Sequence, residues 1–225
     1  MIDTRTPAAT WIRVGLFALP LYGLLTAYAT LEPQPDQVAD PEGWARFVSS
    51  TSYLVGHILS NVLGAALAIF GTFALGAFLA ASKAPRLALS GMVLAVIGQI
   101  FFTVPGALST FATPAIGAAY LAGNRGVMEL QFAAAVTVII VVALLLATVG
   151  NGMLSAAIWR SGTLPRWAGI SWAAGTLIFY ALGAAAGMAT TGASLPTQPI
   201  GALLLAISGA WIAWSALRQR ELSGV

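Results

Sequence analysis

Six long apolar stretches restrict the fold of this chain more than any other feature. They cover residues about 12–30, 51–80, 87–107, 128–158, 167–189 and 198–217. A run of about 20 apolar residues crosses the hydrocarbon core of a membrane as a helix, because a helix satisfies its backbone polar groups within one segment. The stretches lack the polar–apolar alternation of barrel strands. We therefore expect an all-α polytopic transmembrane helical bundle of six spans, forming one domain over residues 1–225.

The charged residues are too few for a soluble protein. Lys, Arg, Asp and Glu make up 8% of the 225 residues, whereas about 25% is usual in a soluble domain. This excludes a soluble globule, a disordered tail and a nucleic-acid-binding domain, so we expect contact with membrane lipid and no nucleic acid. The chain has no cysteine and one histidine, which excludes disulfides and thiolate or multi-histidine metal sites. We expect no metal and no cofactor.

The placement of the charges predicts the orientation. Short loops on the cytoplasmic side carry an excess of Lys and Arg. With the N-terminus in the cytoplasm, only Arg46 and Arg125 fall outside. The other eight basic residues fall inside: Arg5, Arg13, Lys83, Arg86, Arg160, Arg166, Arg218 and Arg220. We therefore expect both termini to be cytoplasmic and the chain to be a multi-pass protein of the cell (plasma or inner) membrane.

The first stretch has an alternative interpretation. Arg5 and Arg13, an apolar run and then Ala27-Tyr28-Ala29 resemble a signal peptide with its cleavage site. The run is longer than an ordinary signal-peptide core, so we expect a retained helix. Pro20 lies inside it and predicts a kink.

The segment 105–127 is moderately apolar but is broken by two prolines and several glycines. As a seventh span it would place the basic loops around residues 83–86 and 160–166 on opposite sides, against the charge bias. We expect an outer loop with a short interfacial helix. It either connects two spans or acts as a lid.

The second and fourth stretches share a pattern at their inner ends. Residues 71–86 and 150–166 both place glycine, leucine, serine and Pro-Arg in one order, with one inserted residue. This pattern suggests a parallel repeat of two hairpins, 51–107 and 128–189; chance similarity is the alternative. Gly183 and Gly187 form a small-residue face that favours close helix contact. That contact would form within the chain or in a homo- or hetero-oligomer.

Polar side chains are costly in lipid, so those within the spans are candidates for function. Five of them fall in one outer layer under the expected topology: His57, Asn61, Gln99, Glu129 and Gln131. They would line a ligand-binding pocket open to the outer face, with Tyr22, Tyr28, Tyr53 and Tyr180 adding hydroxyls. The alternative is structural: Glu129 and Gln131 would face headgroups, while His57 and Asn61 would hydrogen-bond neighbouring helices.

Three functions follow from this pocket. The leading hypothesis is a protein that binds a lipophilic small molecule or a membrane partner through its outer half. The second is an integral-membrane enzyme acting on a lipid or isoprenoid, with His57 and Glu129 as the candidate catalytic acid and base. The third is a transporter component, although the spans have no charge at mid-membrane.

The inner loop Arg160-Ser161-Gly162-Thr163-Leu164-Pro165-Arg166-Trp167 resembles loops of small polytopic bacterial membrane proteins, an uncharacterised family common in actinobacteria. The similarity would cover most of the chain. Because that family has no agreed activity, the resemblance implies a location and a helical fold but no mechanism.

Overall fold

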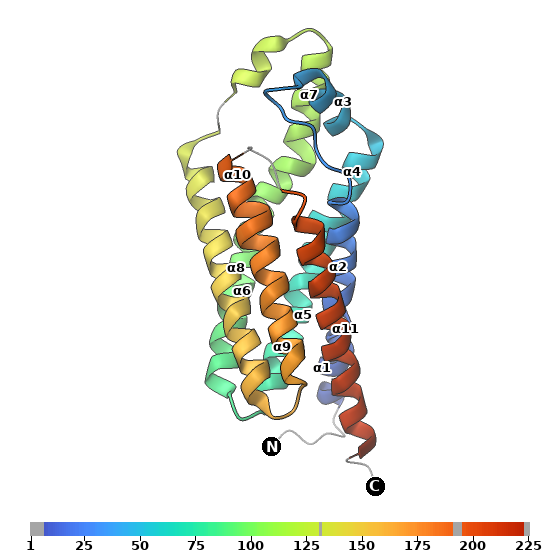
Figure 1. The fold of residues 1–225 in the computed structure, drawn as a ribbon, viewed down its shortest axis with the longest axis vertical. Coiled ribbons are helices and arrows are strands. Elements are labelled where there is room, and N and C mark those ends of the chain that lie inside the picture. The colour runs from blue at the N-terminus through green and yellow to red at the C-terminus, as the bar shows by residue number, and fades with distance from the viewer. Residues whose placement is uncertain (1–6, 131, 191–194, 223–225) are drawn as a thin grey trace.

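The computed structural model describes residues 7–130, 132–190 and 195–222. Within these ranges the chain is helical and contains no strand (Figure 1). Six of its helices are long and apolar enough to cross a membrane. The expected all-α bundle of six spans is therefore confirmed, and the chain is a multi-pass membrane protein.

Each span consists of one to three helical segments, of which η1, η2 and η4 are π-helical. Span 1 contains α1 (Pro7–Gly15) and α2 (Ala18–Ala29), and span 2 contains α4 (Thr51–His57), η1 (Ile58–Gly64) and α5 (Ala65–Ala80). Span 3 contains α6 (Pro85–Ala107), η2 (Leu108–Ala112) and α7 (Thr113–Leu121), and span 4 is α8 (Ala134–Ser161). Span 5 contains α9 (Arg166–Thr176), η4 (Leu177–Ala186) and α10 (Gly187–Thr190), and span 6 is α11 (Gln198–Leu222). Outside the spans lie α3 (Pro41–Val48) and the 3-10 helix η3 (Arg125–Glu129).

Span 1 is interrupted where Pro20 predicts a kink. The helix breaks between Gly15 and Ala18, one turn before the proline. Proline has no N–H, so the carbonyl one turn earlier loses its usual partner. Here the Leu16 carbonyl accepts the Leu19 N–H instead (3.1 Å).

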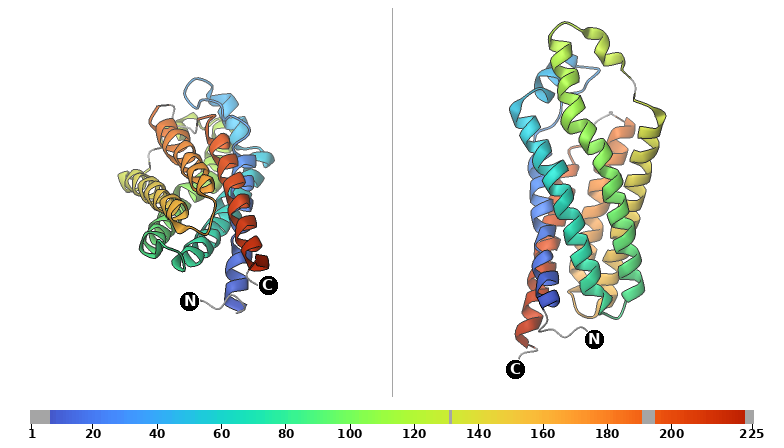
Figure 2. Two further views of the ribbon diagram at one scale, coloured as in Figure 1. Left: turned by 60° about the horizontal axis from the view of Figure 1, so that its bottom comes forward. Right: turned by 180° about the vertical axis from the view of Figure 1, so that it is seen from behind.

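The six spans form a closed ring, in which each packs on the next and span 6 returns to span 1 (Figure 2). Each interface has a glycine at which an added Cβ would clash with the neighbouring helix, so the backbones approach closely. These contacts are Gly71 on Leu19, Gly76 on Met92, Gly98 on Ala147, Gly169 on Ser155, Gly201 on Phe179 and Gly209 on Leu19. Gly183 packs in the same way, since its Cβ would lie 2.8 Å from the Gln198 Cα. Gly183 thus makes close helix contact within the chain, and an oligomer through Gly183 and Gly187 stays a prediction.

The two ends of the ring differ in packing and charge. At the end where α1 begins and α11 finishes, here the basal end, large side chains such as Leu16, Leu75, Leu154, Ile158 and Ile212 are fully buried. The described basic residues other than Arg46 and Arg125 lie toward this end. The opposite, distal end carries α3, α7 and η3 (Figure 1).

Span 3 corrects the expectation of a loop over 105–127. The helix continues from Pro85 to Leu121, so the prediction is wrong for most of that segment. At about 1.5 Å per residue, its 37 residues span about 55 Å, whereas the hydrocarbon core is about 30 Å thick. The span is therefore longer than the hydrocarbon is thick, and its α7 segment lies beyond the distal ends of the neighbouring spans (Figure 1).

Side-chain hydroxyls donate to backbone carbonyls around the two prolines of this segment, where the helix lacks two N–H groups. The Tyr53 hydroxyl donates to the Ser109 carbonyl (3.1 Å), and Thr110 Oγ1 donates to the Gly106 carbonyl (2.7 Å). Such side-chain donors help membrane helices to tolerate proline. They come partly from span 2, so the sequence of span 3 alone does not reveal them.

The projecting helix α7 packs against α3, and together they cap the distal end. Asp40 starts α3, because its Oδ1 accepts the Gly43 N–H (2.9 Å) and proline follows it. Trp44 and Val48 on α3 are buried in a cluster with Tyr120 of α7. This cluster fixes α7 in place above the ring.

The turns of the suggested repeat have similar local structure. Ser82 Oγ accepts the Ala84 N–H (3.2 Å), and Ser161 Oγ accepts the Leu164 N–H (3.1 Å). A small hydroxyl thus closes both basal turns before the next span begins. Duplication of the hairpins stays a prediction.

Candidate functional site

A cavity of about 760 Å³ lies in the distal half of the ring. All six spans contribute to its wall, and the loop 31–37 and α3 line its distal side. The π-helical segments η1, η2 and η4 all border it; such turns are frequent at functional sites. Small-molecule sites commonly measure about 300–1,000 Å³, so this cavity, here the distal cavity, is the candidate site.

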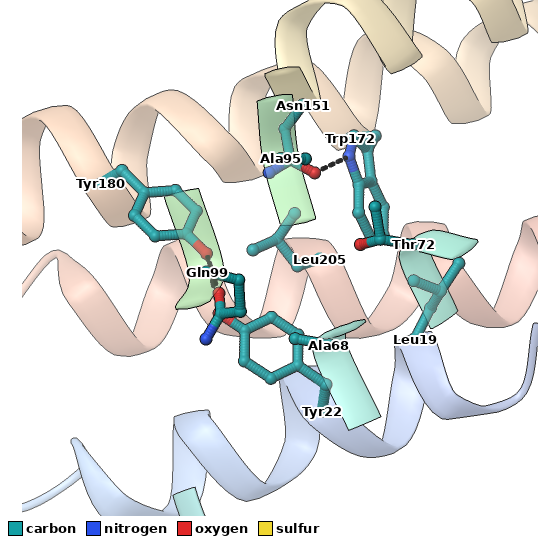
Figure 3. A pocket seen from close by; sticks show the side chains of 10 residues that line it. All are labelled: Leu19, Tyr22, Ala68, Thr72, Ala95, Gln99, Asn151, Trp172, Tyr180 and Leu205. Carbon is teal, nitrogen blue, oxygen red and sulfur yellow. Dashed lines mark hydrogen bonds between the residues drawn. The ribbon is translucent and has the colours of Figure 1, made fainter. Parts of the chain in front are cut away.

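The floor of the distal cavity separates it from a smaller void, whose lining residues Figure 3 shows. This floor is a hydrogen-bonded set of buried side chains from three spans. The Tyr22 and Tyr180 hydroxyls lie 3.1 Å apart, and the Tyr180 hydroxyl donates to Gln99 Oε1 (3.2 Å). Gln99 is 7% exposed and lines the cavity. Its Nε2 donates to no described residue, so two N–H groups remain for a ligand or water.

The smaller void beneath this floor measures about 10 Å³, enough for about one water molecule. It is bordered by Asn151 and Trp172, and the Trp172 Nε1 donates to Asn151 Oδ1 (3.0 Å). The Asn151 Nδ2 donates to the Ala147 carbonyl (2.9 Å). Asn151 is therefore occupied in joining spans 4 and 5, as structural polar residues are.

Asn61 lines the distal cavity but is also bound within the chain. Its Nδ2 donates to the Gly106 carbonyl (3.2 Å) and to Thr110 Oγ1 (3.1 Å). These bonds join span 2 to the bend of span 3. The structural interpretation therefore holds for Asn61.

His57 is half-buried in the cavity wall, where it stacks on the Tyr53 ring with centroids 3.8 Å apart. Its Nδ1 lies 2.9 Å from the Tyr53 carbonyl. A carbonyl only accepts, so in this contact Nδ1 carries the proton. In the neutral ring, Nε2 then remains as a hydrogen-bond acceptor.

Glu129 does not join the cavity. The sequence predicts that it begins the fourth span, but that span begins at Ala134, and Glu129 ends the exposed η3 turn. It is not among the residues that line the cavity, so the expected His57/Glu129 pair is not assembled there. The backbone kinks through η3 before span 4, which separates Glu129 from the membrane helix. Gln131 lies outside the described residues.

The charges of the distal cavity are acidic and lie at its mouth. Glu32 and Asp36, on the loop after span 1, both line it, and no lysine or arginine does among the described residues. The N–H groups of Ala39 (2.9 Å) and Val38 (2.7 Å) donate to Asp36 Oδ1. These two bonds lower the pKa of the Asp36 carboxyl below its ordinary value. Asp36 is therefore anionic at neutral pH.

Some residues that line the distal cavity are not predicted from the sequence. Gln198 starts span 6, where a polar residue would ordinarily face headgroups, yet it is 7% exposed and lines the cavity. Its side-chain amide bonds to no described residue. Trp44 and Phe47 reach the site on α3, whose Asp-Pro start is visible in the sequence. Of the four candidate tyrosines, Tyr22 and Tyr53 line the cavity, Tyr180 lines only the smaller void beneath it, and Tyr28 is 57% exposed and lines neither.

Comparison with protein-family models, curated proteins and solved structures finds no match for this chain. The resemblance to small bacterial membrane proteins therefore stays a prediction. The fold and the site define the class: a multi-pass membrane protein whose six spans close into a ring around a distal cavity.

Proposed function

We propose that this chain binds a lipophilic small molecule in the distal cavity. The observation that carries the proposal is a cavity of about 760 Å³ inside the ring, with a floor amide, Gln99 Nε2, that lacks a partner among the described residues. Because Gln99 lines the cavity, a ligand acceptor that enters the cavity can bond to this amide.

The use of the polar side chains favours binding over a purely structural role. The side-chain amides of Asn61 and Asn151 form hydrogen bonds within the chain. His57, Gln99 and Gln198 keep a donor or an acceptor that no described residue uses, and all three line the cavity. The surrounding wall is rich in aromatic and aliphatic side chains, as in sites for drug-sized molecules.

We further propose that the distal end faces outward from the cell membrane. The basic residues at the basal end support this orientation, because Lys and Arg in short loops favour the cytoplasmic side; they include Arg13, Lys83, Arg86, Arg160, Arg166 and Arg218. The ligand would then enter from the outer face or the outer leaflet.

The test is equilibrium dialysis of the protein in phosphatidylcholine nanodiscs, with empty nanodiscs as the blank. Three probes of similar shape differ in charge: triphenylphosphine oxide (neutral), tetraphenylphosphonium (cation) and tetraphenylborate (anion). We expect saturable binding of at least one of them, near one molecule per chain.

A pair of neighbouring variants locates the binding. Thr103 lines the distal cavity, so Thr103→Phe narrows it and should weaken saturable binding. Val104 is 36% exposed and does not line the distal cavity, so Val104→Phe should bind as the wild type does. The proposal is wrong if no probe binds saturably, or if both variants bind equally well.

A further inference from the structure

The mouth of the distal cavity is acidic, and the two arginines of the distal end, Arg46 and Arg125, bond to other side chains. Arg46 Nη1 pairs with Glu42 Oε1 (2.6 Å). Arg125 donates to the Tyr120 hydroxyl (2.6 Å) and lies over that ring, 5.0 Å from its centroid. Glu32 and Asp36 have no basic partner among the described residues.

Aromatic rings stand beside this acidic mouth. Trp44 and Phe47 of α3 line the distal side of the cavity. Tyr53 of α4 lines it too, but His57 stacks on one face of that ring with centroids 3.8 Å apart, and the Phe47 ring meets it edge to face at 5.6 Å. The faces of aromatic rings attract cations, most strongly where water is excluded. The wall next to the acidic mouth therefore suits a positive group that leaves water.

Buried amides extend the polar surface into the cavity. Gln99 and Gln198 are each 7% exposed, line the cavity, and leave amide groups without a described partner. The site thus combines two carboxylates at its mouth, aromatic faces along its distal wall and unused amides within.

We infer that the ligand of the distal cavity is an amphiphilic cation, of the class of lipophilic amines and quaternary ammonium compounds. This inference rests on the proposed function. A cation enters past Glu32 and Asp36 with favourable Coulomb energy, while a fatty acid or anionic lipid meets two like charges and no described lysine or arginine. The apolar part of the ligand occupies the wall formed by spans 3, 4 and 5.

The experiment compares tetraphenylphosphonium, tetraphenylborate and triphenylphosphine oxide on the wild type and on the double variant Glu32→Gln/Asp36→Asn. We expect the cation to bind the wild type most tightly, with an affinity that falls as salt rises. Each carboxylate contributes about a few-fold in affinity at a hydrated mouth, so the double variant should bind the cation about tenfold more weakly. Its affinity for the neutral probe should not change.

Glu129→Gln is the matched control, because Glu129 is an exposed acid of the same end that pairs with no described basic residue and does not line the cavity. It should bind all probes as the wild type does. The inference is overturned if the neutral or anionic probe binds as tightly as the cation. It is also overturned if the double variant keeps the wild-type affinity and salt dependence for the cation. If none of the probes binds, the proposed function itself fails.

Discussion

Replacing Asn61 by alanine tests whether this side chain joins spans 2 and 3. Its Nδ2 makes two hydrogen bonds across the interface, to the Gly106 carbonyl and to Thr110 Oγ1. Bonds between membrane helices contribute about 0.6 kcal/mol each on average, so we expect the free energy of unfolding to fall by about 1.2 kcal/mol. The Gly106 carbonyl keeps the Thr110 hydroxyl as a donor (2.7 Å), so no further penalty arises from an unpaired carbonyl.

The assay is reversible unfolding in mixed micelles by added dodecyl sulfate, followed by circular dichroism. Val62→Ala is the control, since Val62 follows Asn61 but is 54% exposed on the outside of the ring. A double-mutant cycle with Thr110→Val isolates the Asn61–Thr110 bond and should give a coupling of about 0.6 kcal/mol. If Asn61→Ala is as stable as Val62→Ala, or if the coupling is zero, the structural role of Asn61 is refuted.

Three further changes have defined outcomes. Trp172→Phe leaves Asn151 Oδ1 without its donor and should cost about 1–3 kcal/mol in the same titration; an unchanged midpoint would contradict this. Gly23→Ala places a Cβ 2.6 Å from the Ala206 backbone nitrogen, so spans 1 and 6 must separate and the unfolding midpoint should fall; wild-type stability would show that the helices shift at no cost. The two amides bonded to Asp36 should titrate by NMR with a midpoint below 3.8. Because this pKa is lowered by folding, the turn is stabilised at neutral pH and loses that stability as acid protonates Asp36; a midpoint at or above 3.8 would exclude the bonds.

The membrane spans follow from the sequence because lipid imposes one simple requirement. A segment that crosses hydrocarbon must be apolar over its length and must satisfy its own backbone, so spans such as 51–80 are visible as runs. The two prolines of span 3 lead to the wrong prediction of a loop, because a proline in the sequence indicates only that one backbone N–H donor is missing at that position. Side-chain donors near them, such as Tyr53, come from another helix, and no local pattern encodes that contact.

The candidate site is only partly visible for a similar reason. His57 and Gln99 stand out because polar residues are rare in apolar stretches, and both line the cavity. Glu129 stands out equally but leaves the bundle through η3, whereas Gln198 resembles an ordinary helix start. Which polar group faces the cavity depends on helix rotation and on the packing of glycines such as Gly183. Those are properties of the whole ring.

The absence of cysteine allows the most direct test of the central claim, that the distal half of the ring encloses a ligand-accessible cavity. Single cysteines at Thr103 and Val104 are exposed to a water-soluble, cationic methanethiosulfonate reagent, with the protein in nanodiscs. The cysteine at Thr103 should react, and tetraphenylphosphonium should protect it, because that position lines the cavity. The cysteine at Val104 should react slowly, because that position lies within a membrane span and does not line the cavity. Equal rates at both positions, with no protection by the probe, would contradict the cavity and the function proposed from it.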